Sequence, residues 1–196
     1  MTYDERMHKE KGLGLAKEIF NKENLHLLSG NIGISHNRYP THGGFSHGEV
    51  QPFWTSVPYG IALAHNGNLT NYEDLAKEVT KEETRYLNTT SDSEVLLHLF
   101  ADRLHQNIPP QNSEEFFDLL CEAVTSIFNK VKGAYSVTSL IIGKGLVVFR
   151  DPQGIRPLVK GERLNKNGKK DFIFASENTM FYPLGFEPKG TVLPGE

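Results

Sequence analysis

The segment Tyr59–Asn71 constrains the fold most, because it places a predicted strand directly before a predicted helix. Ile61–Ala64 is an apolar run typical of a buried strand. Asn66–Gly67 follows it, and Asn-Gly is the strongest short-range turn signal, since both residue types tolerate a positive φ. Thr70 and Glu73 then have capping-box spacing, which predicts that a helix begins there. The segment therefore predicts a strand, a turn and a helix in close succession.

The polar residues of this segment also suggest chemistry. Gly67 offers a backbone N–H, and Asn66 a side-chain amide, to an oxygen that becomes negative during acyl transfer. An isolated Asn-Gly pair is more often a turn and nothing more. The interpretation therefore depends on the motifs that surround it.

Composition indicates one ordinary domain over residues 1–196. The chain has 38% hydrophobic and 23% charged residues and a net charge of −3, so there is no basic surface of the kind that binds nucleic acid. A single cysteine, Cys121, excludes an internal disulfide framework and fits a reducing compartment. The charged start is unlike a signal peptide, and no apolar run approaches the roughly 20 residues that span a bilayer. We expect a cytoplasmic protein without a membrane partner.

Two charged residues are candidates for binding a free amino acid. Arg38 ends a predicted strand over residues 30–36, just before a Pro-containing turn, where a guanidinium can hold a carboxylate through two parallel bonds. Asp92 lies in the first turn of a helix that Ser91 and Glu94 are spaced to cap. A carboxylate there complements the helix dipole, and it can also receive an ammonium group. A surface ion pair for Arg38 and a purely structural Asp92 are the alternatives.

The remaining nucleophilic and metal-ligating residues carry less signal. The histidines at 36, 42, 47 and 65 lack the spacing and the accompanying carboxylates of a metal site, so no metal is expected. Cys121 lies on or beside the apolar stripe of a helix predicted over residues 113–131, four residues after Phe117. We therefore expect it to be a buried packing residue and not a nucleophile.

The order of elements predicts an α+β fold. A hairpin is expected over residues 133–150, with its turn at Gly143–Gly145, and further strands near residues 158–161 and 171–175. Strands, then helices, then strands with hairpins indicate helices packed on antiparallel sheets.

The motifs together resemble a known family. Residues 64–71 (Ala-His-Asn-Gly-Asn-Leu-Thr-Asn), residues 88–95 (Asn-Thr-Thr-Ser-Asp-Ser-Glu-Val) and residues 150–158 (Arg-Asp-Pro-Gln-Gly-Ile-Arg-Pro-Leu) are similar to the glutamine-hydrolysing domain of amidophosphoribosyltransferase. The resemblance runs from about Gly12 to Glu196. It implies a four-layer αββα sandwich of the N-terminal-nucleophile hydrolases and a domain that supplies ammonia from glutamine for 5-phosphoribosylamine synthesis in purine production.

The resemblance also implies site roles. Arg38 would bind the glutamine carboxylate, Asp92 its amino group, and Thr41 would line the pocket. Asn66 and Gly67 would form the oxyanion hole. No cofactor is implied for this domain. The full enzyme would be a homo-oligomer in which a phosphoribosyltransferase domain follows.

The chain departs from the family pattern at its start. The family's nucleophile is a cysteine at the mature N-terminus, whose own α-amino group acts as the base, and no such residue occurs here. We therefore expect the fold to be incomplete at the N-terminus and the chain to be inactive alone. A glucosamine-6-phosphate synthase-type glutaminase, favoured by Thr41-His42-Gly43, and a non-catalytic glutamine-binding or assembly module are the alternatives.

Overall fold

The computed structural model describes residues 1–38, 47–81 and 84–196. The N-terminal part forms a small antiparallel sheet with the strand order β2-β1-β3, followed along the chain by a short 3₁₀ helix. Its elements are β1 (Thr2–Tyr3), β2 (Met7–His8), α1 (Ala16–Ile19), α2 (Lys22–Leu25), β3 (Ile32–Gly33) and η1 (His47–Glu49). The strand expected over residues 30–36 is therefore present only as the two residues of β3.

A four-stranded antiparallel sheet with the order β4-β5-β6-β7 forms the centre of the molecule. Its strands are β4 (Phe53–Thr55), β5 (Ile61–Leu69), β6 (Gly133–Ile141) and β7 (Gly145–Arg150). The pairing of β6 with β7 confirms the hairpin expected over residues 133–150. Its turn contains Gly143, whose φ of 72° favours glycine.

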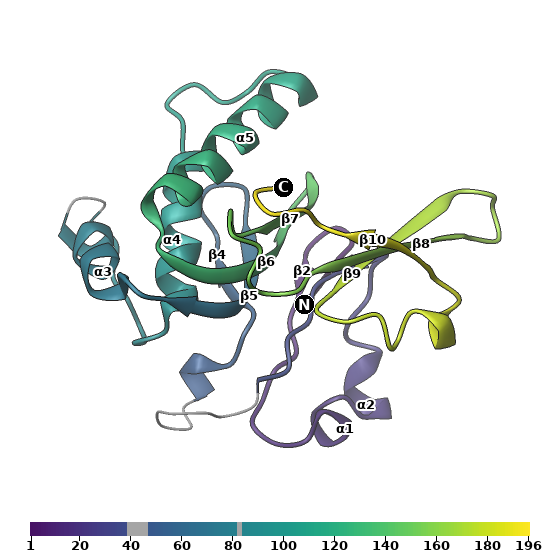
Figure 1. Cartoon of the computed structure of the whole chain (residues 1–196). Helices are drawn as coiled ribbons and strands as arrows, with labels where there is room; N and C mark the ends of the chain where they lie inside the picture. The colour runs from purple at the N-terminus through teal and green to yellow at the C-terminus, as the bar shows by residue number, and fades with distance from the viewer. Residues whose placement is uncertain (39–46, 82–83) are drawn as a thin grey trace.

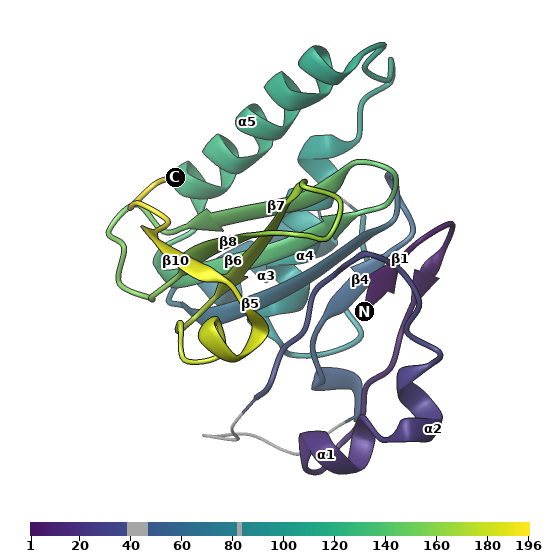
Figure 2. The ribbon, with the colours of Figure 1, turned by 90° about the vertical axis from the view of Figure 1, so that its right-hand side faces the viewer.

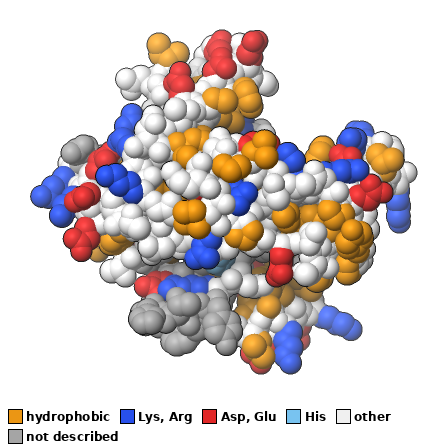
Figure 3. All heavy atoms as spheres, in the orientation of Figure 1, with side chains coloured by type: hydrophobic (Ala, Val, Ile, Leu, Met, Phe, Trp, Pro, Cys, Tyr) orange, Lys and Arg blue, Asp and Glu red, His pale blue; other side chains and the backbone are white. Residues whose placement is uncertain are grey.

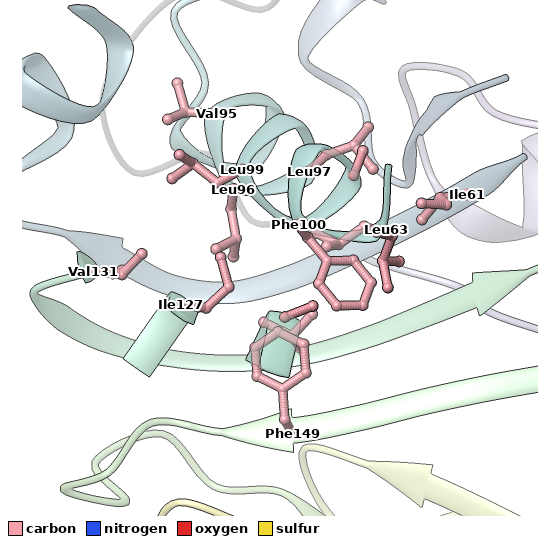
Figure 4. Close-up of a cluster of buried hydrophobic side chains, with 14 of the residues drawn as sticks. Ile61, Leu63, Val95, Leu96, Leu97, Leu99, Phe100, Ile127, Val131 and Phe149 are labelled. Carbon is pink, nitrogen blue, oxygen red and sulfur yellow. The ribbon is translucent and has the colours of Figure 1, made fainter. Parts of the chain in front are cut away.

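Three helices cover one face of this sheet (Figure 1). They are α3 (Tyr72–Lys81), α4 (Asp92–Leu104) and α5 (Ser113–Lys130). Leu63 of β5, Phe100 of α4 and Phe149 of β7 are all at most 1% exposed in the core between them (Figure 4). Burying a side chain of this size contributes roughly 1.5–3 kcal/mol, so this core fixes the helices on the sheet.

A third sheet follows, with the order β10-β8-β9. Its elements are β8 (Val159–Leu164), β9 (Lys170–Ala175), η2 (Tyr182–Leu184) and β10 (Glu187–Thr191). The two views agree that this sheet and the N-terminal sheet lie on the side of the central sheet opposite the helices (Figures 1 and 2). A second, smaller core forms there from Ala62, Ala64 and Leu140 of the central sheet with Met1 and Ile34. The expected α+β class is thus confirmed.

The predicted turn at Asn66–Gly67 is wrong. β5 continues through both residues to Leu69 and pairs with β6 over its whole length, with Asn66 opposite Ser136 and Gly67 opposite Tyr135. The local turn preference is overridden because nine consecutive residues gain a paired neighbour strand. The helix then begins at Tyr72 and not at a Thr70 cap.

The predicted burial of Cys121 is also wrong, because the side chain is exposed on α5. Phe117, one turn earlier, is 63% exposed, whereas Phe116, Leu119 and Ala123 are buried. The buried stripe of α5 is therefore narrower than the run of apolar residues suggests, and Cys121 lies outside it.

The segment Arg150–Leu158 forms a rigid corner after β7. Asp151 is fully buried, and its carboxylate accepts hydrogen bonds from the backbone N–H groups of Tyr135, Gln153 and Ile155. The Arg150 guanidinium donates to backbone carbonyl oxygens within and beside the corner. This motif of the family resemblance thus has a structural role here.

Candidate functional site

The end of β5 directs alternate side chains to opposite faces of the central sheet. Ile61, Leu63 and His65 point toward the helices, while Ala62 and Ala64 belong to the core on the other side. Asn66 therefore faces the space between the sheets, where its Nδ2 donates to Oγ of Ser176 at 3.3 Å. A cavity of about 360 Å³ lies there, lined in part by Asn66, Ser136 and Ser176.

Glycine is required at position 67 because no side chain fits there, and not because of its backbone conformation. Its φ is not among the positive values of the chain. A Cβ atom at this position would lie 1.9 Å from the carbonyl oxygen of Ala134 and 2.6 Å from Nε2 of His65. Any side chain would therefore push β5 away from β6. The glycine allows the backbone beside Asn66 to remain in the sheet.

Asp92 lies beside the same end of β5. Its Oδ2 accepts a hydrogen bond from the backbone N–H of Leu69 at 3.1 Å, and Oδ1 lies 3.7 Å from Nδ1 of His65. Burial alone would raise the pKa of Asp92, but the interaction with His65 and the backbone N–H bonds outweigh it and hold the pKa below its ordinary value. The side chain is 25% exposed, so the carboxylate can also meet a ligand.

His65 joins the strand to the helix. Its side chain is 1% exposed, and Nδ1 lies 3.1 Å from Oγ of Ser93 in the first turn of α4. The backbone N–H of His65 donates to Oε1 of Gln51 at 2.7 Å, and its carbonyl accepts from Nε2 of Gln51 at 3.1 Å. One glutamine side chain thus pairs with the strand as a neighbouring backbone would, and it fixes the segment before β4 to β5.

Glu94 organises the approach to α4. Its Oε1 accepts from the backbone N–H and the Nδ2 of Asn88, both at 2.9 Å. Its Oε2 accepts from the backbone N–H and the Oγ1 of Thr89, at 2.8 and 2.7 Å. Ser91 caps the helix as expected, by accepting from the N–H of Ser93, but Glu94 bonds Asn88 and Thr89 instead of completing the predicted capping box. Both oxygens of the Glu94 carboxylate thus accept two hydrogen bonds each, and these bonds hold the segment that leads to Asp92.

Arg38 follows β3 and is 41% exposed. Its Nη1 lies 3.3 Å from Oε2 of Glu49, whose other oxygen accepts from Oγ1 of Thr90 at 3.4 Å. Because Thr90 is two residues before Asp92, Glu49 connects Arg38 to the start of α4. Arg38 and Glu49 also line a cavity of about 590 Å³. Thr41, expected to line the pocket, lies outside the described residues.

The histidines follow no metal-binding arrangement in the part of the chain that the structure describes, where no group of three His, Cys, Asp or Glu side chains could hold an ion. Burial, with the nearby His65 and Arg38, lowers the pKa of His36 to about 4, so this side chain is neutral at pH 7. Within the same residues, no helix combines the length and the hydropathy needed to cross a bilayer.

The structure thus bonds Asp92 to Leu69, at the end of the strand that carries Asn66 and Gly67, and connects Arg38 to the start of α4 through Glu49 and Thr90. Asn66 and Arg38 line different cavities, and Asp92 lines neither of them. Sequence reasoning missed Glu49, Gln51, His65 and Ser176 as contributors. His65 was considered only as a metal ligand, and the other three have partners between 11 and 110 residues away, which no local pattern reveals. Glu94 differs from these four residues, because its spacing from Ser91 was a local signal in the sequence.

Comparison with known proteins identifies the class of protein to which the chain belongs. A family model described as "Glutamine amidotransferase domain" matches residues 36–183. This range includes each of the candidate residues. The chain therefore belongs to the glutamine amidotransferase domain family.

The individual relatives are amidophosphoribosyltransferases. The enzyme of Pseudomonas aeruginosa is 44% identical over 99% of this chain, and that of Escherichia coli is 44% identical over 95%. The enzyme of Saccharomyces cerevisiae is 41% identical over 97%. The chain spans 38%, 36% and 37% of their respective lengths, so it corresponds to one part of these relatives. They favour the amidophosphoribosyltransferase resemblance over the glucosamine-6-phosphate synthase alternative.

Solved structures agree with the sequence relatives. A structure titled as the allosteric regulatory enzyme of purine biosynthesis has a TM-score of 0.78 and 30% identity, and it covers 98% of this chain and 38% of its own. The glutamine phosphoribosylpyrophosphate amidotransferase of Bacillus subtilis, in complex with ADP and GMP, has a TM-score of 0.73 and 29% identity. It covers 94% of this chain and 36% of its own.

Proposed function

We propose that residues 1–196 form part of a glutaminase domain that releases ammonia from the side-chain amide of glutamine. The ammonia would serve the synthesis of 5-phosphoribosylamine from phosphoribosyl pyrophosphate, in a phosphoribosyltransferase domain outside these residues. The observation that carries the proposal is the bond between Asp92 and Leu69, at the end of the strand that carries Asn66 and Gly67, inside the range matched by the glutamine amidotransferase model.

The proposed roles follow from charge and position. Arg38 holds the α-carboxylate of glutamine, and Asp92 holds its ammonium group, because each is a partly exposed charge beside a cavity or a helix start. Asn66 and the backbone N–H of Gly67 stabilise the oxyanion that forms when the amide carbonyl is attacked. Thr41, outside the described residues, is the further residue proposed for glutamine binding. No metal or other cofactor is needed for this reaction.

The nucleophile is proposed to be a cysteine at the mature N-terminus of a segment outside residues 1–196. Its α-amine accepts the thiol proton, and the sulfur attacks the amide carbon. The resulting α-ammonium then returns the proton to the amide nitrogen as the C–N bond breaks, which releases ammonia and leaves a thioester. Water then hydrolyses the thioester to glutamate. Cys121 cannot take this role, because α5 and Asn66 lie on opposite faces of the central sheet.

The edges of two sheets support this proposal. β3 ends the N-terminal sheet and β9 ends the C-terminal sheet, and residues 33–36 and 172–176 line the cavity that Asn66 faces. An extended segment entering there would pair with both edges and join the two sheets into one. The result would be the four-layer αββα sandwich, with the entering segment next to Asn66.

Further partners are proposed from the surface of the molecule. Figure 3 shows hydrophobic side chains gathered over the part of the molecule formed by β8, β9 and η2. Phe172 of β9, Tyr182 of η2 and Met180, just before η2, are 59–72% exposed. Exposed apolar patches mark interaction surfaces, which fits a homo-oligomer or a contact with the phosphoribosyltransferase domain. We place the protein in the cytoplasm, without a nucleic-acid or membrane partner.

A fusion experiment tests the function. A cysteine-led N-terminal segment of the family pattern is placed before Met1, and glutamate and ammonia release from L-glutamine are measured. We expect release from the fusion, none from the same fusion with its leading cysteine changed to alanine, and none from residues 1–196 alone. A fusion that binds glutamine without releasing ammonia would support the non-catalytic module instead.

A further inference from the structure

The Arg38 guanidinium is already occupied by a carboxylate of its own chain. Nη1 of Arg38 and Oε2 of Glu49 are 3.3 Å apart, and Glu49 is the one carboxylate that contacts Arg38 in the described residues. Glu49 is 18% exposed and Arg38 41%, so the pair lies at the rim of the 590 Å³ cavity and not in the core. The carboxylate of an incoming amino acid would therefore find Arg38 already paired with Glu49.

The ion pair is weak enough to be exchanged. Charge-assisted N–H···O bonds are usually 2.7–2.9 Å long, and arginine binds carboxylates best through two parallel bonds. Arg38 makes a single contact with Glu49, at 3.3 Å. Thr90 holds the other Glu49 oxygen at 3.4 Å, also near the limit of a hydrogen bond. An exposed pair of this kind contributes little, so a better-placed carboxylate can displace it.

We propose that Glu49 competes with the α-carboxylate of the amino-acid ligand for Arg38 and thereby lowers the affinity of the site. This inference rests on the proposed function, because it takes Arg38 as the carboxylate-binding residue. When the ligand binds, Arg38 exchanges the single contact with Glu49 for the two-pronged contact with the ligand. Glu49 keeps its contact with Thr90 and turns toward solvent.

The sign of one substitution separates this role from its main alternative. Glu49 could instead assist Asp92 in binding the ligand ammonium, because Thr90 lies two residues before Asp92. If Glu49 competes for Arg38, Glu49→Gln tightens glutamine binding, since the competing charge and its repulsion of the ligand carboxylate are both removed. If Glu49 binds the ammonium, the same substitution weakens glutamine binding.

Calorimetric titration of the fusion with its leading cysteine changed to alanine tests the proposal without a nucleophile. L-glutamine is compared with L-glutaminamide, which has an uncharged amide in place of the α-carboxylate. Glu49→Gln should tighten L-glutamine binding about two- to fivefold and leave L-glutaminamide unchanged. Glu162→Gln is the matched control, because it removes one negative charge paired with Lys170 on the surface of β8 and should change neither ligand.

Two further measurements complete the test. Glu49→Ala should give the same gain as Glu49→Gln, and thermal melting confirms that both variants fold. In an Arg38→Gln background, Glu49→Gln should give no gain. If the unchanged protein binds L-glutamine and the Glu49→Gln variant binds it equally or more weakly, the competition is overturned but the proposed function is not. If neither the unchanged protein nor the Glu49→Gln variant binds L-glutamine, the proposed function is overturned as well.

Discussion

The backbone N–H of Leu69 donates to Oδ2 of Asp92 at 3.1 Å, so the last residue of β5 is bonded to the first residue of α4. Asn66 lies three residues earlier on the same strand. The proposed oxyanion donor and the proposed ammonium-binding carboxylate are therefore linked through one strand and one hydrogen bond. This connection allows the two residues to be tested separately.

Asp92→Asn is expected to weaken glutamine binding by about 2–5 kcal/mol, because the ammonium loses its charged partner. The amide oxygen can still accept from Leu69, so α4 should stay in place. Titration of L-glutamine into the variant measures the loss, and an unchanged circular dichroism spectrum confirms the fold. Unaltered affinity would show that Asp92 has only its structural role.

Asn66→Ala is expected to lower kcat roughly 10²–10³-fold in the cysteine-led fusion, with little change in KM. The amide acts on the oxyanion, which exists only as the reaction proceeds. Steady-state kinetics of ammonia release would check this. A rise in KM alone would instead assign Asn66 to ground-state binding, where its contact with Ser176 would also matter.

Gly67→Ala is expected to destabilise the fold by at least about 3 kcal/mol, because the new methyl group would overlap the Ala134 carbonyl oxygen. Gly168→Ala is the control. It lies at a φ of +72° with no atom within 4 Å of the added Cβ, so it should cost only about 1–2 kcal/mol. Urea denaturation of both variants measures the loss of stability from steric overlap at Gly67 and from backbone strain at Gly168. Equal losses of stability would contradict the steric argument.

Cys121→Ser is expected to leave ammonia release by the fusion unchanged and to alter stability by no more than about 0.5 kcal/mol. The side chain is exposed on the helix side of the central sheet. The same kinetic and denaturation measurements apply. Loss of activity in this variant would mean that Cys121 reaches the site by a route that the fold does not provide.

The stability of the fold is expected to fall in two stages as the pH is lowered. The folded pKa of His36 is about 4, below the ordinary value of about 6.5, so the unfolded chain binds the extra proton first and stability falls as the pH drops between these values. Asp92 and Glu94 have lowered pKa values, so their contributions are present above about pH 4.5 and are lost below it. Urea denaturation from pH 7 to 3 would show both stages, and His36→Gln should remove the upper one.

Local patterns predicted the elements whose partners are close in the chain. The hairpin of β6 and β7 followed from alternation and its glycine turn, and Ser91 was recognised as a helix cap. The turn at Asn66–Gly67 was predicted wrongly, because its strand conformation depends on β6, about 70 residues later. Cys121 was expected to pack on or beside the buried stripe of its helix, because periodicity shows which residues are apolar but not how wide a buried face is.

The candidate site was predictable only as separate motifs. Arg38, Asn66 and Asp92 were identified from residue type and position, but their arrangement depends on contacts across the fold. Gln51 pairs with the backbone of His65, and Glu49 bridges Arg38 and Thr90. Neither glutamine nor glutamate carries a local pattern that reveals such a distant partner.

Glu94 accepts hydrogen bonds from the amides of Asn88 and Thr89, which lie outside any helix or strand. These two amides should therefore exchange their hydrogens with solvent slowly, as amides within a helix do, and only when the first turn of α4 opens. Hydrogen–deuterium exchange at residues 88 and 89 consequently reports whether the segment before Asp92 is assembled, without any bound ligand or chemical reaction. A slow-exchanging pair of amides within an irregular segment would be a spectroscopic marker for the intact site.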